Sequence, residues 1–200
     1  MHLIFVALLS LSLIACSGDP AELPRLDDDA IILAFGDSLT RGTGAGKGQS
    51  YPDVLQRLSG RKVVNAGIPG EQTAAGLERI ARVLNKHDPQ LLILCHGGND
   101  MLRKKSIAKA QQNIENMIAE ARERGIPVVL LGVPKPGIFL SSADFYQAAA
   151  ERTNTPLITD LISDVLGDAG LKSDPAHPNA AGYQFMAETI YEALQNYGAL

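Results

Sequence analysis

Apolar runs alternate with amphipathic stretches along most of this chain. Five runs rich in Val, Ile and Leu predict buried strands: Ile31–Phe35, Lys62–Asn65, Leu91–His96, Pro127–Val133 and Pro156–Thr159. Between these runs, apolar residues recur with the spacing of one helix face, which predicts helices over Thr73–Lys86, Ser106–Arg124 and Asn179–Tyr197. Strands that alternate with helices of this length predict βαβ units and a parallel sheet, so we expect one α/β domain.

The amino-terminal segment departs from this pattern. Leu3–Ile14 is almost continuously apolar but too short to span a bilayer comfortably, which is typical of a secretory signal. Its end, Leu13-Ile14-Ala15-Cys16, resembles a bacterial lipobox, in which the cysteine becomes the lipidated first residue of the mature protein. An ordinary signal peptide with an incidental cysteine is the alternative. We therefore expect a signal peptide over residues 1–15, a lipidated Cys16 with a solvated tether over residues 16–29, and the domain over residues 30–200.

Lipidation of Cys16 would place the protein in the bacterial envelope. More than one acyl chain on Cys16 would anchor the chain stably to a membrane. Ser17, rather than Asp, follows the cysteine, which resembles lipoproteins of the outer membrane that face the periplasm. Cys95 is the one other cysteine, so lipidation leaves no disulfide, and its place at the end of an apolar run predicts a buried, inert thiol.

The bulk composition is that of an ordinary globular domain. Of the 200 residues, 46% are hydrophobic and 20% are charged, which is enough to bury a substantial core. The formal net charge of -4 argues against a nucleic-acid-binding protein, because such proteins usually present a basic face.

The first predicted strand ends in Gly36-Asp37-Ser38, a candidate catalytic segment. Ligands of open α/β sheets bind at the carboxyl ends of the strands, so Ser38 is placed to act as a nucleophile. A serine in this position is also a common turn residue or helix cap. The segment alone therefore leaves both interpretations open.

A second candidate segment, Asp174-Pro175-Ala176-His177, precedes the last predicted helix. An Asp and a His three residues apart can share a hydrogen bond on one stiff loop. The carboxylate then fixes the imidazole tautomer, and the other ring nitrogen can take the proton of Ser38. The alternative is a structural loop that leads into a helix capped by Asn179, but it gives no reason for Asp174 and His177. Asp37, beside the nucleophile, is expected to brace the turn.

Two further strand ends carry candidate oxyanion donors. Asn99, in Gly97-Gly98-Asn99-Asp100, could donate from its side-chain amide or could cap the next short helix. Gly67 could offer its backbone N–H to a ligand at close range or could serve only as a turn residue. Preorganised donors of this kind typically contribute roughly 3–4 kcal/mol each to an acyl-transfer transition state.

A Gly-rich loop, Gly42–Gly48, looks like a phosphate loop but fails the pattern. Arg41 stands where the first glycine belongs, and Gly48 stands where Ser or Thr must bind magnesium. We therefore expect this segment to be a loop beside the site. His96 is expected to be structural or to support the residues of the site from behind, a functional role being the less favoured interpretation. Pro134–Leu140 either lies near an acyl pocket or is a connection packed on the core.

The segments that carry Ser38, Gly67, Asn99 and the Asp174–His177 pair together resemble the SGNH (GDSL) hydrolase superfamily. The resemblance is strongest to its bacterial periplasmic arylesterase/thioesterase/lysophospholipase branch. The resemblance implies a flavodoxin-like three-layer α/β/α sandwich with a five-stranded parallel sheet in the order 2-1-3-4-5. It implies hydrolysis of an ester or thioester through an acyl-enzyme on Ser38, with His177 as base and Asp174 as its orienting acid. The oxyanion donors would be Ser38, Gly67 and Asn99. Neither a metal nor an organic cofactor is expected.

The same resemblance implies a small acyl-ester or lysophospholipid-like substrate, and we expect a monomer whose membrane contact is the lipid anchor. Two alternatives remain open. A carbohydrate or peptidoglycan O-deacetylase would use the same triad with a different pocket. A non-catalytic binding lipoprotein would keep the fold without the reaction.

Overall fold

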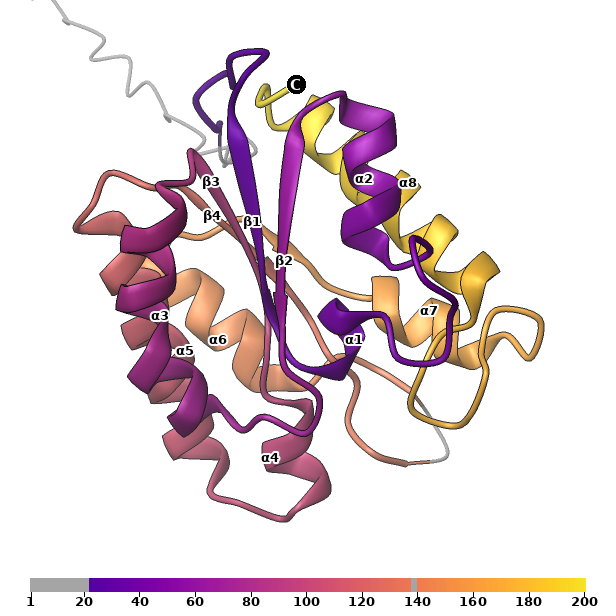
Figure 1. Cartoon of the computed structure of the whole chain (residues 1–200). Coiled ribbons are helices and arrows are strands. Elements are labelled where there is room, and N and C mark those ends of the chain that lie inside the picture. Colours follow the sequence, from indigo (N-terminus) through magenta and orange to yellow (C-terminus); the bar gives the residue numbers. More distant parts are fainter. Residues whose placement is uncertain (1–21, 138–139) are drawn as a thin grey trace, which may run out of the picture.

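The computed structural model describes residues 22–137 and 140–200 and shows a three-layer α/β/α arrangement (Figure 1). Five parallel strands form one sheet in the order β2-β1-β3-β4-β5. The predicted fold class and strand order are therefore confirmed, whereas the predicted signal peptide and Cys16 lie outside the described residues. The bounds of the strands are β1 (Ile31–Gly36), β2 (Lys62–Gly67), β3 (Leu91–Cys95), β4 (Val128–Leu131) and β5 (Leu157–Ile158).

Helices cover both faces of the sheet (Figure 1). One face carries α3 (Thr73–His87), α5 (Ile107–Arg122) and α6 (Asp144–Thr153). The other face carries α2 (Tyr51–Ser59), α7 (Leu161–Gly167) and α8 (Ala180–Asn196). Within the described ranges, every helix is too short or too polar to cross a membrane.

Two short helices, α1 (Ser38–Arg41) and α4 (Gly98–Leu102), begin just past the ends of β1 and β3. The periodicity did not predict α2, α6 or α7. Of these, α2 carries a clear start signal in the sequence, because Ser50 and Asp53 form a capping box around Pro52.

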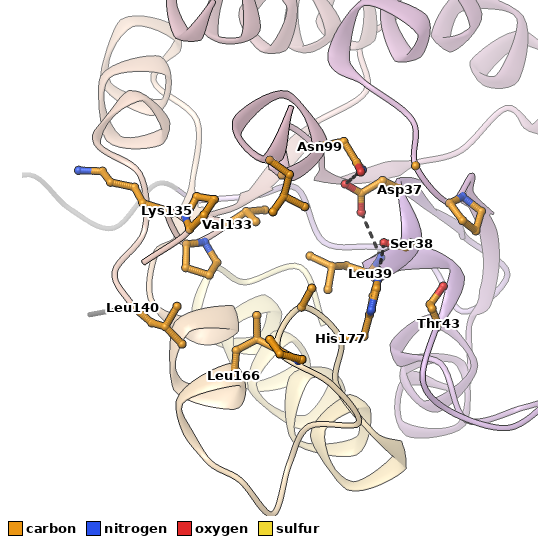
Figure 2. A pocket seen from close by; sticks show the side chains of 18 of the residues that line it. Asp37, Ser38, Leu39, Thr43, Asn99, Val133, Lys135, Leu140, Leu166 and His177 are labelled. Atoms are coloured by element: carbon orange, nitrogen blue, oxygen red, sulfur yellow. Dashed lines mark hydrogen bonds between the residues drawn. The ribbon is translucent and has the colours of Figure 1, made fainter. Parts of the chain in front are cut away.

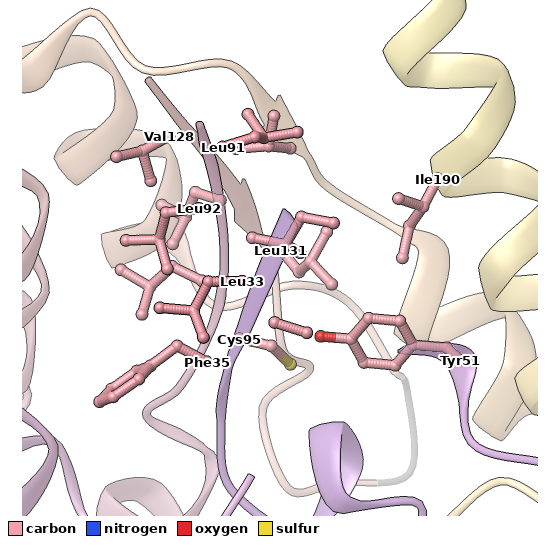
Figure 3. Packing of buried hydrophobic residues seen from close by; sticks show 14 of the residues in the cluster. Leu33, Phe35, Tyr51, Leu91, Leu92, Cys95, Val128, Leu131 and Ile190 are labelled. Atoms are coloured by element: carbon pink, nitrogen blue, oxygen red, sulfur yellow. The ribbon is translucent and has the colours of Figure 1, made fainter. Parts of the chain in front are cut away.

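The centre of the sheet is buried on both faces. Leu91, Leu92 and Cys95 of β3 are fully buried, and Leu33 and Phe35 of β1 pack beside them (Figure 3). Burying one large apolar side chain contributes about 1.5–3 kcal/mol, so these strands form the rigid platform from which the site projects. Burial raises the pKa of the Cys95 thiol well above its ordinary value, which keeps it protonated as an inert core thiol.

The described chain begins with an amino-terminal strap, residues 22–30, at the amino edge of the sheet. The Leu23 N–H donates a hydrogen bond to the Tyr197 carbonyl oxygen (2.8 Å), just past the end of α8. Leu26 is buried, and its carbonyl oxygen accepts a hydrogen bond from Arg61 (2.9 Å). The carboxyl-terminal part of the expected tether is therefore attached to the domain through Leu23 and Leu26, whereas most of its other residues are exposed.

Candidate active site

Ser38 lies at the sharp turn between β1 and α1. β1 ends at Gly36, where an added Cβ would lie 2.1 Å from the Cys95 carbonyl oxygen, so the close approach of the two strand ends requires glycine. Asp37 caps α1 by accepting a hydrogen bond from the Leu39 N–H (3.1 Å). This turn presents Ser38 at the carboxyl edge of the sheet.

The structure brings Ser38, His177 and Asp174 together in one hydrogen-bonded chain, of which Figure 2 shows the contact between Ser38 and His177. His177 Nε2 lies 3.0 Å from Ser38 Oγ, and His177 Nδ1 lies 2.8 Å from Asp174 Oδ2. Hydrogen bonds from the Ala176 N–H, together with the contact to His177, lower the pKa of the Asp174 carboxyl. An ionised Asp174 holds the hydrogen of the ring on Nδ1, which leaves Nε2 free to accept the proton of Ser38.

The Asp174–His177 loop is shaped mainly by local contacts. Asp174 Oδ1 accepts hydrogen bonds from the backbone N–H groups of Ala176 (2.7 Å) and His177 (2.9 Å). Asn179 caps α8 by accepting from the Gly182 N–H (3.0 Å). The segment is thus both the lead into a helix and the carrier of the Asp–His pair, so the two interpretations of the sequence are compatible.

Asn99 is oriented by Asp37 across 62 residues of sequence (Figure 2). Its Nδ2 donates one hydrogen bond to Asp37 Oδ2 (3.0 Å), and the second hydrogen on the same nitrogen remains for a ligand. Burial raises the pKa of Asp37, although hydrogen bonds from Leu39 and Asn99 oppose this shift. Asp37 therefore does more than brace its turn. Nothing local in the sequence indicates this contact, because it depends on the pairing of β1 with β3.

Gly67 does not take the role predicted for it. Its N–H donates to Asn65 Oδ1 (3.0 Å) and is therefore occupied within β2. An added Cβ at Gly67 would lie 2.3 Å from the Arg41 nitrogen, so this glycine allows β2 to pack closely against α1. Its function in this structure is close packing beneath the site.

Gly70 occupies the place expected of the glycine donor. It lines the same cavity as Ser38 and Asn99, whereas Gly67 does not. Gly70 has a φ of 77°, and the Glu71 N–H donates to the Ile68 carbonyl oxygen (3.2 Å), as in a type II turn. Among the residues that the structure describes, the Gly70 N–H has no hydrogen-bond acceptor. The Pro69-Gly70 pair, which favours such a turn, is the signal in the sequence that identifies this position.

A mostly apolar cavity of about 500 Å³ opens beside Ser38 (Figure 2). Its apolar wall is formed by residues from α1, α4, the segment that follows β4, and α7, among them Leu39, Leu102, Val133, Leu140 and Leu166. The loop that follows β4 therefore lines the cavity, as one of its two interpretations predicted. Apolar lining with a few polar groups at one end is typical of a site for a small amphiphilic ligand.

The other candidates from the sequence lie beside or below the triad. Thr43, on the Gly-rich loop, lies on the cavity wall, and its carbonyl oxygen accepts a hydrogen bond from the Tyr183 hydroxyl (2.8 Å). His96 is fully buried beneath the site. Across residues 22–137 and 140–200, His, Cys, Asp and Glu side chains form no group of three or more that could hold a metal ion.

Comparison with known proteins agrees with this geometry. Residues 34–185 match the GDSL-like Lipase/Acylhydrolase family. "Esterase TesA" from Pseudomonas aeruginosa is 32% identical over 175 residues, which cover 82% of this chain and 87% of that protein. "Thioesterase 1/protease 1/lysophospholipase L1" from Escherichia coli (strain K12) is 25% identical over 202 residues, covering 97% and 92% of the two chains.

A solved structure described as "Crystal Structure of TesA" superposes with a TM-score of 0.76 at 30% sequence identity. The superposition covers 84% of this chain and 99% of the solved one, so the similarity spans nearly the whole of the solved domain.

Proposed function

Because this chain belongs to the GDSL-like lipase/acylhydrolase family and is a carboxylic ester hydrolase, we propose that it cleaves esters or thioesters of apolar acyl groups through an acyl-enzyme on Ser38. The observation that carries this proposal is the hydrogen-bonded chain from Asp174 through His177 to Ser38 at the mouth of an apolar cavity. The family membership agrees with the resemblance found in the sequence.

The proposed reaction has two steps. Ser38 Oγ attacks the acyl carbon while His177 Nε2 takes its proton, and the carbonyl oxygen becomes an oxyanion. The Ser38 N–H, the Gly70 N–H and the free Asn99 Nδ2 hydrogen stabilise this oxyanion. His177 then gives the proton to the departing alcohol or thiol. Water, deprotonated by His177, attacks the acyl-enzyme, and the carboxylic acid leaves as Ser38 regains its proton.

The lining of the cavity favours an acyl chain over a sugar. A glycan would need several polar partners, whereas Leu39, Val133, Leu140 and Leu166 offer mainly apolar contact. Small acyl esters, acyl thioesters and lysophospholipid-like molecules all combine a chain of this kind with a polar leaving group. A carbohydrate or peptidoglycan O-deacetylase is therefore the second candidate.

The test is labelling of the purified full chain with a fluorophosphonate probe, followed by a panel of p-nitrophenyl esters from acetyl to dodecanoyl. We expect labelling of the wild type and loss of both labelling and hydrolysis in Ser38→Ala. A Ser38→Ala protein that hydrolyses esters at the wild-type rate would refute the proposal. Faster release of acetate from acetylated peptidoglycan than from any ester of the panel would favour the deacetylase.

We further propose that residues 1–15 are a signal peptide and that Cys16 is lipidated, which anchors the domain to the outer membrane on its periplasmic side. The support is the lipobox-like sequence Leu13-Ile14-Ala15-Cys16 followed by Ser17. Metabolic labelling with radioactive palmitate tests this proposal. We expect Cys16→Ser to abolish labelling and Cys95→Ser, the matched control at the buried thiol, to retain it. Retained labelling in Cys16→Ser would contradict lipidation at that cysteine.

A further inference from the structure

A buried cluster of Glu71, Arg79 and His96 lies beneath the strand ends that carry the oxyanion donors. Arg79 Nε donates to both carboxylate oxygens of Glu71 (2.7 and 2.9 Å), and Arg79 Nη2 donates to Oε2 (2.6 Å). His96 Nε2 lies 3.1 Å from the same oxygen. None of these three residues lines the cavity, and the proposed reaction uses none of them.

The hydrogen bonds define the tautomer of His96 and the ionisation state of Glu71. The Gly97 N–H donates to His96 Nδ1 (3.1 Å), so the ring hydrogen is on Nε2 and is donated to Glu71. Burial disfavours ionisation of Glu71, but hydrogen bonds from His96 and Arg79 outweigh it and lower the pKa of the carboxyl. Glu71 is therefore a carboxylate held by two different donors.

The cluster contacts the ends of the strands that precede two of the three donors. Arg79 Nη2 donates to the carbonyl oxygens of Gly36 (3.2 Å) at the end of β1 and Ala66 (2.9 Å) near the end of β2. Ser38 is two residues beyond Gly36 along the chain. The ends of β1 and β2 are thus joined through one guanidinium group.

The other two donors are attached to the cluster through the backbone. Gly70 directly precedes Glu71, and His96 directly follows β3, three residues before Asn99. The His96 carbonyl oxygen also accepts a hydrogen bond from the Tyr146 hydroxyl (2.7 Å), which fixes this backbone from α6. Each donor therefore lies within three residues of a group that the cluster holds.

The packing around the cluster leaves little room for rearrangement. The Arg79 guanidinium lies 3.8 Å from the centre of the Phe35 ring. An added Cβ at Gly76 would lie 2.6 Å from His96 Nε2, so α3 packs directly on the imidazole. A shift of one member would therefore be transmitted to the others through these close contacts.

We propose that Glu71, Arg79 and His96 are positioning residues that set the Ser38 N–H, the Gly70 N–H and the Asn99 amide at the spacing the oxyanion requires. This inference rests on the proposed function. Oxyanion donors act mainly in the transition state, so misplacing them lowers kcat and leaves KM nearly unchanged. Misplacement of reacting groups by about 1 Å can cost about 100-fold in rate.

The main test compares two arginines that have similar exposure and similar backbone contacts but lie at different places in the fold. The Arg79 side chain is 10% exposed and that of Arg61 is 13% exposed, and each donates to two backbone carbonyls of other segments. Arg61 lies at the opposite edge of the sheet, beside the strap. We expect Arg79→Lys to lower kcat by about 10- to 100-fold with KM within about threefold, and Arg61→Lys to leave both unchanged.

A second pair separates the two hydrogen bonds of His96. His96→Gln can still reach Glu71, whereas His96→Asn can satisfy only the Gly97 N–H. We expect His96→Gln to retain most of the activity and His96→Asn to lose kcat as Arg79→Lys does. The affinity for an aryl boronic acid, which mimics the oxyanion, should fall in parallel with kcat. This pair decides the question if Arg79→Lys does not fold.

The outcomes distinguish the two proposals. A wild-type chain that neither hydrolyses esters nor labels at Ser38 would refute the proposed function. An active wild type whose Arg79→Lys and His96→Asn variants keep wild-type kcat and boronate affinity would refute the positioning role alone. Equal losses of kcat in Arg61→Lys and Arg79→Lys would also refute the positioning role, because they would reflect a general loss of protein stability.

Discussion

The two sides of the active site are built in opposite ways. On the proton-transfer side, the Asp174 side chain is 47% exposed, and the hydrogen bonds that shape its pair with His177 come from within the same short loop. On the oxyanion side, Asp37 is 2% exposed and binds Asn99 from a different strand end. The first side needs only a local loop, whereas the second needs the assembled sheet. Substitutions on the first should affect mainly activity, with only a small effect on stability, whereas those on the second should affect both activity and stability.

The largest expected effect comes from the proton-transfer side. His177→Ala should lower kcat/KM by at least about 10⁴-fold, because within residues 22–137 and 140–200 no other side chain lies within hydrogen-bond distance of Ser38 Oγ to take its proton. The midpoint of thermal unfolding should move by no more than about 2 °C, since the side chain lies on an exposed loop. Steady-state kinetics and thermal melts measure the two quantities. A loss of activity below tenfold would remove His177 from its proposed role.

Asn99→Ala should give the contrasting behaviour. Loss of one oxyanion donor should lower kcat by about 10²- to 10³-fold with little change in KM. The same substitution leaves the buried Asp37 carboxyl without one of its donors, which costs about 1–3 kcal/mol of unfolding free energy. Denaturant titration should detect this loss. An Asn99→Ala variant with wild-type stability would show that this residue of the oxyanion side contributes to activity but not to the stability of the fold.

The assignment of Gly70, instead of Gly67, as the glycine oxyanion donor can be tested without a substitution. On titration with an aryl boronic acid, the backbone amide signal of Gly70 should move strongly downfield in the NMR spectrum as it gains an acceptor. The Gly67 signal should move little, because its N–H already donates to Asn65. A large shift at Gly67 with none at Gly70 would reinstate the prediction made from the sequence.

The smallest expected effect is a dependence of stability on pH. The pKa of Asp174 is lowered in the folded protein, so its contribution is present above the unfolded value near 3.8 and is lost as pH falls through the lower folded pKa. Wild type should exceed Asp174→Asn in unfolding temperature by about 1–2 °C at neutral pH, a small difference because the group is well solvated. Melts in acid should show the two proteins converging. A difference that grows on acidification would contradict this assignment.

The contrast also explains what the sequence could predict. Ser38 and the Asp174–His177 pair lie in short segments whose residue types alone predict their chemistry. Strands β1 and β3 are continuous apolar runs, so their burial is predictable as well. Contacts that depend on strand pairing leave no local signal. The Asp37–Asn99 hydrogen bond and the contact of His96 with Glu71 join residues far apart in sequence. Gly67 ends β2 and Gly70 lies three residues beyond it, and only the geometry shows which N–H is free.

The strap at the start of the described chain has a consequence for how the molecule can be attached. It joins the domain at the amino edge of the sheet, whereas Ser38 lies at the carboxyl edge, about 20 Å away along the six residues of β1 (Figure 1). A bead or a fusion partner joined upstream of Glu22 is therefore linked to the described domain at the edge of the sheet opposite the cavity mouth. Attachment at this end requires no change in any segment that lines the cavity.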